Sequence, residues 1–140
     1  MTELLELRGL VEASADSVAE VLLDVRPGGR SPLAATGDAE PADGDEFAVA
    51  IDGSRMTVVV DRAARSVSRQ GEWWYRGVTS VEPDPRGSIV VHRIFNVAPG
   101  HRWAVRFVSR GPLLAAPTEF AEHLQSLARQ LGVTARVLEP

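Results

Sequence analysis

The chain of 140 residues contains no cysteine, which excludes a disulfide framework, a thiolate metal site and a cysteine nucleophile. It also contains no lysine, so all 15 basic residues are arginine. We interpret this bias as the codon usage of a GC-rich genome. No apolar run approaches the roughly 20 residues that cross a bilayer. Because the first residues also lack the pattern of a secretory signal, we expect a cytoplasmic protein without a membrane span.

The composition is that of an ordinary globular protein, with 44% hydrophobic and 24% charged residues. A chain of this length buries enough surface for a core of its own, so we expect one domain over residues 1–140. The formal net charge of -4 disfavours general attraction to nucleic acid or to anionic lipid.

The first part of the chain predicts a strand followed by a helix. Residues 5–12 alternate with a period of two, as in a strand with one buried face. Ser14 is a good N-cap, and an apolar stripe from Val18 to Val25 continues the helix until the Arg26-Pro27-Gly28-Gly29 stop. The segment 26–45 that follows is rich in proline, glycine and acidic residues. It reads as a long surface loop that could hide a short helix around residues 33–35.

The middle of the chain predicts an antiparallel meander. Alternating segments at 47–51, 56–60, 66–70, 72–81 and 88–98 are separated by turn signals, including Asp52-Gly53 and residues 83–87. Hairpin connections imply antiparallel neighbours, because parallel ones need crossover helices. Residues 102–109 fit either a helix or a strand.

One amphipathic helix is predicted near the end of the chain. Phe120, Leu124, Leu127 and Leu131 recur at helical spacing, and charged residues occupy the other positions. Pro117 suits the first turn of this helix and Gly132 suits its end. Residues 133–138 would add a short tail.

This order of elements resembles that of START-like helix-grip proteins, a superfamily that includes birch-pollen-allergen-like ligand binders and the polyketide cyclase/dehydrase-like group. The resembling segments are 7–16 (LRGLVEASAD), 89–95 (IVVHRIF) and 120–127 (FAEHLQSL). The resemblance implies an α+β fold, in which a curved antiparallel β-sheet wraps around a long C-terminal helix and leaves a hydrophobic cavity. Segment 26–45 departs from the family, because it is poor in the bulky residues of a second helix that often frames the pocket entrance.

The longest predicted strand carries the best candidate for polar recognition. The alternating set of Ile89, Val91, Arg93, Phe95 and Val97 is bulkier than the set that contains His92, so we expect it to face inward. Arg93 would then be a buried cation that recognises an acidic or keto group. In the reversed register, His92 points inward instead and could transfer a proton. An ordinary salt bridge for Arg93 and a surface position for His92 is the alternative without function.

Trp73-Trp74-Tyr75-Arg76 is the densest aromatic cluster. In a strand Trp73 and Tyr75 share one face, which could line a pocket, and Trp74 and Arg76 share the other, which could form a homodimer contact. Simple core packing is the alternative. The candidate ligand-binding residues are Met56, Trp73, Tyr75, His92, Arg93, Phe95, Phe120 and Leu124.

No catalytic motif is present, and the three histidines lack a metal-ligand spacing, so we expect no metal and no cofactor. The preferred hypothesis is a binding protein for a small hydrophobic ligand, lipid-like or polyketide-like, held between sheet and helix. The resemblance also permits a polyketide cyclase/aromatase-type enzyme, with Arg93 orienting the chain and His92 or Tyr75 moving a proton. A third hypothesis is a protein-interaction subunit that uses the Trp74/Arg76 face and the acidic loop.

Overall fold

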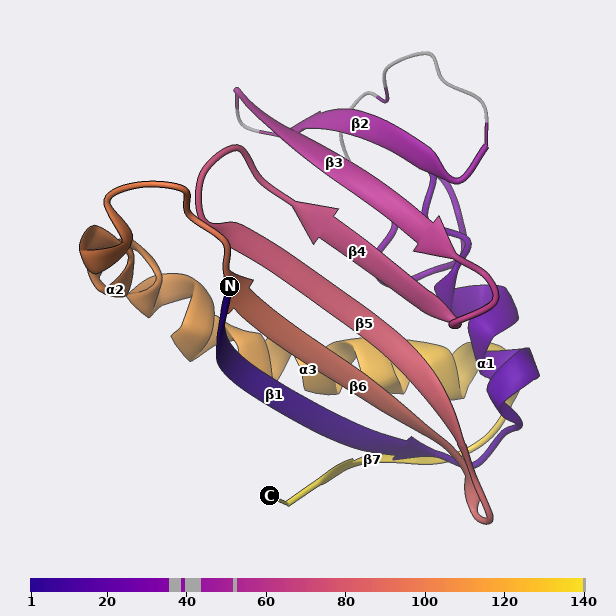
Figure 1. Ribbon diagram of the computed structural model, residues 1–140. Coiled ribbons are helices and arrows are strands. Elements are labelled where there is room, and N and C mark those ends of the chain that lie inside the picture. The colour runs from indigo at the N-terminus through magenta and orange to yellow at the C-terminus, as the bar shows by residue number, and fades with distance from the viewer. Residues whose placement is uncertain (36–38, 40–43, 52, 140) are drawn as a thin grey trace.

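The computed structural model describes residues 1–35, 39, 44–51 and 53–139 (Figure 1). The predicted turn at Asp52-Gly53 therefore lies partly outside the described residues, as does much of segment 26–45. The strands are β1 (Thr2–Val11), β2 (Glu46–Ile51), β3 (Ser54–Asp61), β4 (Ser66–Gln70), β5 (Tyr75–Asp84), β6 (Gly87–Asn96) and β7 (Ala135–Leu138). The helices are α1 (Ala15–Leu22), η1 (Arg102–Ala104), α2 (Val105–Val108) and α3 (Arg110–Leu131).

All strands join one antiparallel sheet in the order β2-β3-β4-β5-β6-β1-β7. The hairpin signals predicted the run from β2 to β6, in which neighbours in sequence are neighbours in the sheet. Pairing of β1 with β6 and β7 joins the two ends of the chain. The sheet curves in front of α3, which crosses behind it, and α1 packs at one end of the same face (Figure 1). The predicted α+β arrangement of a curved antiparallel sheet around a long C-terminal helix is confirmed.

Helix α1 begins as the capping signal predicts. Ser14 Oγ accepts a hydrogen bond from the Ser17 amide at 3.1 Å, which satisfies one of the free N–H groups of the first turn. The helix ends at Leu22 rather than near Arg26, although Leu23 and Val25 are still buried. Residues 31–35 form turns and no helix, and Leu33 packs into the core.

Helix α3 is longer than the sequence predicts. It begins at Arg110, so Pro117 lies inside the helix and not in its first turn. Of residues 102–109, for which the sequence fits either a helix or a strand, 102–108 are helical and Ser109 forms the turn before α3. Gly132 ends α3 with φ of 67°, a left-handed conformation that glycine adopts without a Cβ clash. The expected stripe is buried at Phe120, Leu124 and Leu127.

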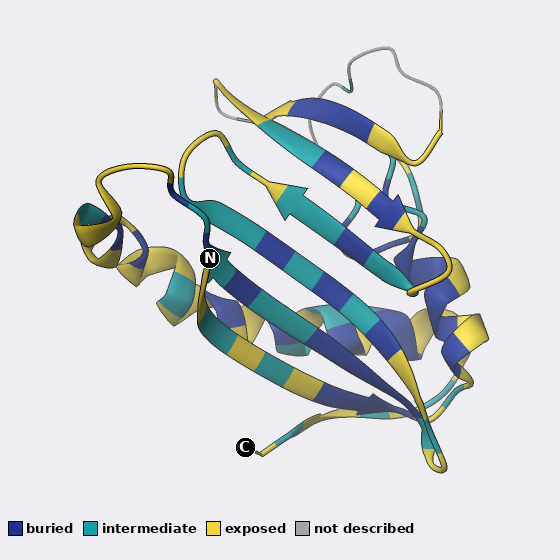
Figure 2. Ribbon diagram, in the orientation of Figure 1, coloured by how far each residue is buried: buried dark blue, intermediate teal, exposed yellow. Residues whose placement is uncertain are grey.

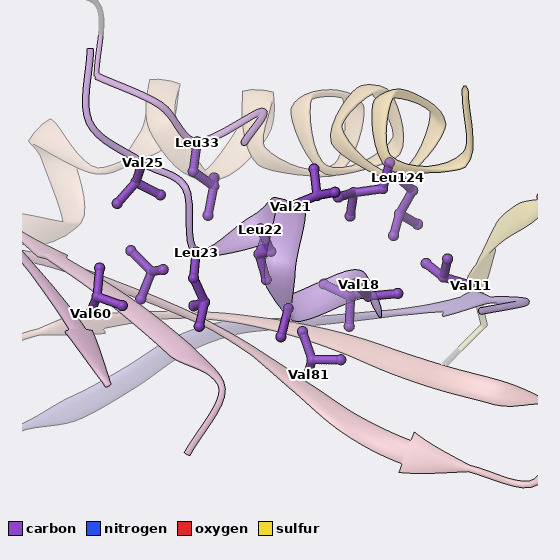
Figure 3. Packing of buried hydrophobic residues seen from close by; sticks show 14 of the residues in the cluster. Val11, Val18, Val21, Leu22, Leu23, Val25, Leu33, Val60, Val81 and Leu124 are labelled. Atoms are coloured by element: carbon purple, nitrogen blue, oxygen red, sulfur yellow. The ribbon is translucent and has the colours of Figure 1, made fainter. Parts of the chain in front are cut away.

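The hydrophobic core fills the space between the sheet, α1 and the C-terminal half of α3 (Figure 3). Gly9 on β1 marks the closest approach, because a Cβ there would overlap Leu124 Cδ1 and lie 2.9 Å from Leu124 Cδ2. Gly9 therefore lets α3 lie directly on the sheet at this end. It also identifies the helix-facing side of β1, which Val11 and Leu7 share.

The expected orientation of β6 is wrong. Val90 pairs with Gly9 and joins the core beneath the helices, so Ser88, Val90, His92 and Ile94 face the helices. Ile89, Val91 and Arg93 face the other side. Bulk could not decide between the faces because both are buried over residues 88–91 (Figure 2). Ile89 and Val91 form a second small cluster with Leu10 and Leu138 on the far face.

The strand expected from residue 72 begins later, at Tyr75. Trp73 and Trp74 precede it, so the alternation of strand faces does not apply to them. The predicted turn at 83–87 is shorter, because Pro83 and Asp84 still pair within the β5–β6 ladder. Within the part of the chain that the structure describes, no helix is long and apolar enough to cross a membrane.

Candidate functional site

A cavity of about 210 Å³ lies between the sheet and the N-terminal half of α3. It is lined from the sheet by Arg69, Tyr75, His92 and Ile94, and from the helix by Pro112, Ala116, Glu119, Phe120 and His123. The two halves of α3 thus differ in what they cover. The C-terminal half packs on the core, whereas the N-terminal half, which lies beyond α1, leaves a space above the sheet.

Local sequence explains the shape of this space. Pro112 and Ala116 present small side chains to it, so the helix fills little of the volume. On the sheet, the Tyr75 ring lies over Gly77, where an added Cβ would be 3.0 Å from Tyr75 Cζ. Trp74 meets the Tyr75 ring edge-on, with centroids 5.4 Å apart. Tyr75 is therefore held flat along β5.

His92 is fixed at the floor of the cavity by two contacts. Its Nδ1 lies 2.8 Å from Thr79 Oγ1 on the neighbouring strand. Its ring stacks on Phe120 of α3, with centroids 6.3 Å apart and planes inclined by 21°. These contacts hold the imidazole between sheet and helix and tie one ring nitrogen to a buried hydroxyl.

Both histidines of the cavity favour the neutral form. Burial is the main cause that lowers the pKa of His92 from 6.5 to about 4, and the nearby Arg69 and His123 contribute to this shift in the same direction. Burial and Arg69 also lower the pKa of His123, although Glu119 and Glu122 oppose the shift. At neutral pH both rings are therefore uncharged, and each offers a donor and an acceptor nitrogen.

The predicted ligand-binding residues divide into four groups, of which the last, Arg93 and Phe95, is described in the next paragraph. Tyr75, His92 and Phe120 line the cavity. Met56 on β3 and Leu124 on α3 lie on the same side of the sheet as the cavity but pack with the hydrophobic core. Trp73 is 36% exposed and donates a hydrogen bond from Nε1 to the Gly100 carbonyl at 3.0 Å.

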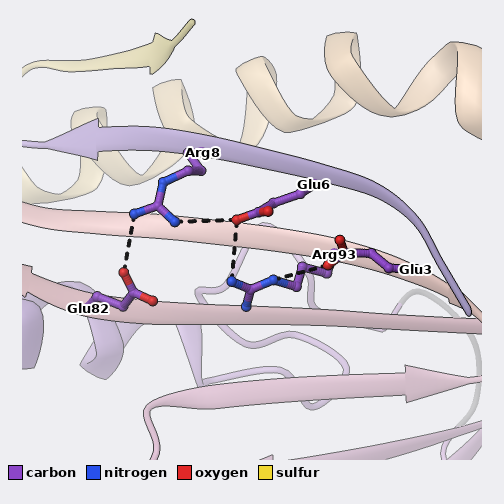
Figure 4. A network of polar contacts seen from close by, with 5 residues as sticks. All are labelled: Glu3, Glu6, Arg8, Glu82 and Arg93. Carbon is purple, nitrogen blue, oxygen red and sulfur yellow. Dashed lines mark hydrogen bonds and ion pairs between the residues drawn. The ribbon is translucent and has the colours of Figure 1, made fainter. Parts of the chain in front are cut away.

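Arg93 and Phe95 lie on the opposite face of the sheet from the cavity, which corrects their expected inward direction. Arg93 Nε lies 3.3 Å from Glu3 and its NH2 lies 3.3 Å from Glu6. Arg8 extends this ladder to Glu6 and Glu82 (Figure 4). Arg93 therefore forms an ordinary salt bridge, as in the alternative without function. His92 points toward the helices, as expected for the reversed register.

Sequence reasoning missed most of the polar lining. Arg69 sits two residues after buried Val67 on β4, and this alternation could have placed it on the helix-facing side. Glu119 and His123 lie among the polar positions of the predicted amphipathic helix, and the helical spacing alone does not show that part of this polar face borders a cavity. Ile94, Pro112 and Ala116 carry no signal that separates a cavity wall from a core position.

A second hollow of about 340 Å³ lies between α1, β2 and β3. Its charged groups are already paired, with Arg30 Nε 3.0 Å from Asp24 and Arg62 NH2 2.9 Å from Asp45. The Arg26 guanidinium lies over the Phe47 ring at 4.6 Å. Polar groups that satisfy one another leave little for a ligand to recognise, so this hollow is the weaker candidate.

No group of three or more His, Asp or Glu side chains gathers to hold a metal among the described residues. The chemistry available in the cavity is hydrogen bonding, one guanidinium charge and apolar contact. Such a mixture of an apolar wall with a few convergent polar groups is typical of small-molecule sites.

Comparison with solved structures agrees with this architecture. A START superfamily protein from Mycobacterium smegmatis is similar over 92% of this chain and 99% of its own, with a TM-score of 0.53 and 16% identity. A conserved protein from Geobacillus kaustophilus is similar over 94% and 99%, with a TM-score of 0.52 and 13% identity. The chain has a START-like fold. No family model matches the sequence, and no curated protein matches it. At these identities the START-like likeness concerns the fold alone.

Proposed function

We propose that this protein binds a small hydrophobic molecule in the cavity between β4–β6 and the N-terminal half of α3. The observation that carries the proposal is the cavity itself, on the face of the sheet that the helix covers. A START-like fold supports it, since proteins with this fold commonly bind hydrophobic ligands. A dry cavity of about 150 Å³ can hold a benzene molecule. The 210 Å³ here therefore suits a substituted single ring or a short acyl chain.

The electrostatics of the cavity favour binding over acid–base chemistry. A general base works best with a pKa near the operating pH, whereas burial lowers the pKa of His92 to about 4. At neutral pH such a histidine is a weak base and is too rarely protonated to act as an acid. Its role in a binding site is that of a fixed hydrogen-bonding group.

Paired alanine variants test the proposal. Ala116 lines the cavity, whereas its neighbour Ala115 on α3 is exposed. Ala116→Leu fills part of the volume and is expected to abolish binding of ethylbenzene, measured by ligand-observed NMR. Ala115→Leu adds the same side chain outside the cavity and is expected to leave binding unchanged. No binding to the wild type in a screen of small aromatic and acyl compounds, or equal binding by both variants, contradicts the proposal.

A polyketide cyclase/aromatase-type enzyme is the second candidate, and one observation favours it. Tyr75 and His92, which the hypothesis named for proton transfer, line the same cavity. Arg93 cannot orient the substrate from the opposite face, so this reading requires Arg69 in that position. Turnover of a cyclisable polyketide that is lost in His92→Gln and retained in Arg93→Gln supports it. Absence of turnover counts against it.

The homodimer and protein-interaction hypotheses stay predictions. Arg76 faces away from the helices and bonds to Gln70 at 3.2 Å, and Trp74 is half-buried beside Tyr75. Trp103 and Leu114 are large apolar side chains with much higher exposure, at 72% and 81%. Sedimentation velocity with and without Trp103→Ser distinguishes a dimer through this region from a monomer.

A further inference from the structure

Arg69 differs from the other partly buried arginines of the protein. Arg65 and Arg93 pair with carboxylates, and Arg76 donates to Gln70. Arg26 also has polar partners. Arg69 is half-buried on β4 and lines the cavity, yet its guanidinium forms no hydrogen bond or ion pair with any described residue. A partly desolvated guanidinium without an anion is unfavourable. The Arg69 side chain is therefore available to bind an anionic ligand.

The neighbours of Arg69 leave room for one negative charge. His92 and His123 are neutral at pH 7, for the reasons given above, and can donate hydrogen bonds without competing as cations. Glu119 on α3 is the single acidic residue of the lining. It would repel a dianion more strongly than a monoanion. The remaining lining consists of Tyr75 and the apolar side chains of Ile94, Pro112, Ala116 and Phe120.

We propose that the cavity binds a small monocarboxylate, with the carboxylate on the Arg69 guanidinium and the apolar body against Phe120 and Ile94. This inference rests on the proposed function and names its ligand class. A guanidinium presents two parallel N–H groups that match the two oxygens of a carboxylate. The cavity volume limits the body to about a substituted benzene ring, so acids of the size of 4-ethylbenzoate are the expected ligands.

A matched pair of probes separates the charge from the apolar body. 4-Ethylbenzoate and 4-ethylbenzyl alcohol have nearly the same shape, but only the first is anionic at pH 7. Isothermal titration calorimetry is expected to show tighter binding of the acid to the wild type. In Arg69→Gln the acid should bind roughly tenfold to a hundredfold more weakly, the range of a charged hydrogen bond, while the affinity of the alcohol changes little. Arg69→Lys keeps the positive charge but lacks the two parallel N–H groups, so its affinity for the acid should lie between those of the wild type and Arg69→Gln.

Arg93→Gln is the matched control, since it removes an arginine from the opposite face of the same sheet and should change neither affinity. Equal binding of acid and alcohol to the wild type overturns the inference and leaves the proposed function intact. Loss of acid and alcohol binding alike in a folded Arg69→Gln also overturns it. Failure of both probes, and of the wider screen, to bind the wild type contradicts the proposed function itself.

Discussion

The buried imidazole of His92 makes the stability of this protein depend on pH in a defined window. Its pKa is about 4 in the folded protein against 6.5 for an ordinary histidine, so the unfolded chain binds more protons between these values. The contribution of His92 to the free energy of unfolding is therefore fully present above about pH 6.5, and it is lost as pH falls toward about pH 4. A shift of this size corresponds to about 3 kcal/mol, at 1.36 kcal/mol for each pKa unit.

Urea denaturation of the wild type and His92→Gln at several pH values measures this contribution. Between about pH 7.5 and about pH 5, we expect the wild type to lose roughly 2 kcal/mol more than the variant. The comparison cancels the titration of groups common to both proteins, including Asp24 and Asp84, whose pKa values are lowered by Arg30 and Arg86. His101→Gln, at an exposed site, should follow the wild type.

Besides burial, two neighbouring groups shift the pKa of His92. Arg69 on β4 and His123 on α3 lower its pKa, and Glu119 on α3 and Tyr75 on β5 also line the cavity. Arg69→Gln should therefore raise the pKa of His92 in the folded protein and so narrow the pH range over which His92 changes the stability. Parallel stability curves for wild type and His92→Gln would refute the reasoning, because they would mean that His92 titrates alike in the folded and unfolded chains.

Three further predictions concern the scaffold, each measured by urea denaturation. Gly9→Ala should cost about 1–3 kcal/mol through overpacking against Leu124, and this cost should shrink in a Leu124→Ala background. Gly100→Ala, with no atom within 4 Å of the added Cβ, is the control, and an equal loss in both would contradict the steric argument. Gly132→Ala should cost about 1–2 kcal/mol, because alanine is strained at a left-handed position; no loss would mean that the helix end rearranges. Arg93→Gln should cost less than about 1 kcal/mol, as for exposed ion pairs, and a larger loss would show that the ladder of Figure 4 holds the sheet together.

The fold could be predicted because each signal for it is local. Hairpin turns determine the neighbours of β3, β4 and β5, and an N-cap with an apolar stripe determines α1. The pairing of β1 with β6 and β7 joins residues far apart in sequence and has no local signal, so the sequence does not predict it, and residues 133–138 were expected only as a short tail. The start of α3 at Arg110 differs from the prediction because Pro117 was expected in the first turn, whereas the helix begins earlier and runs through both Pro112 and Pro117.

The site could be predicted only in part, and β6 shows why. Alternation separates its two faces, but choosing the inner face requires knowing what covers each one. Arg8 and Glu82 form an ion pair, 3.4 Å apart, from the two strands that flank β6, and they help cover fully buried Val91 on the outer face. That outer cover makes Val91 as buried as the core residue Val90, so hydrophobicity alone cannot assign the face.

The position of Gly9 shows which face of β6 points toward the helices, which the size of the β6 side chains does not show. Gly9 pairs with Val90, and only a residue without a side chain allows Leu124 to come so close to β1. The face of β6 that carries Val90 must then be the face beneath α3, and His92 follows it by alternation. The same step places Arg93 outside, and Arg69 joins His92 through the pairing of β4 and β5 with β6. The inward face of β6, and with it the outward position of Arg93, therefore follows from a contact at the other end of the helix, which no local pattern around Arg93 contains.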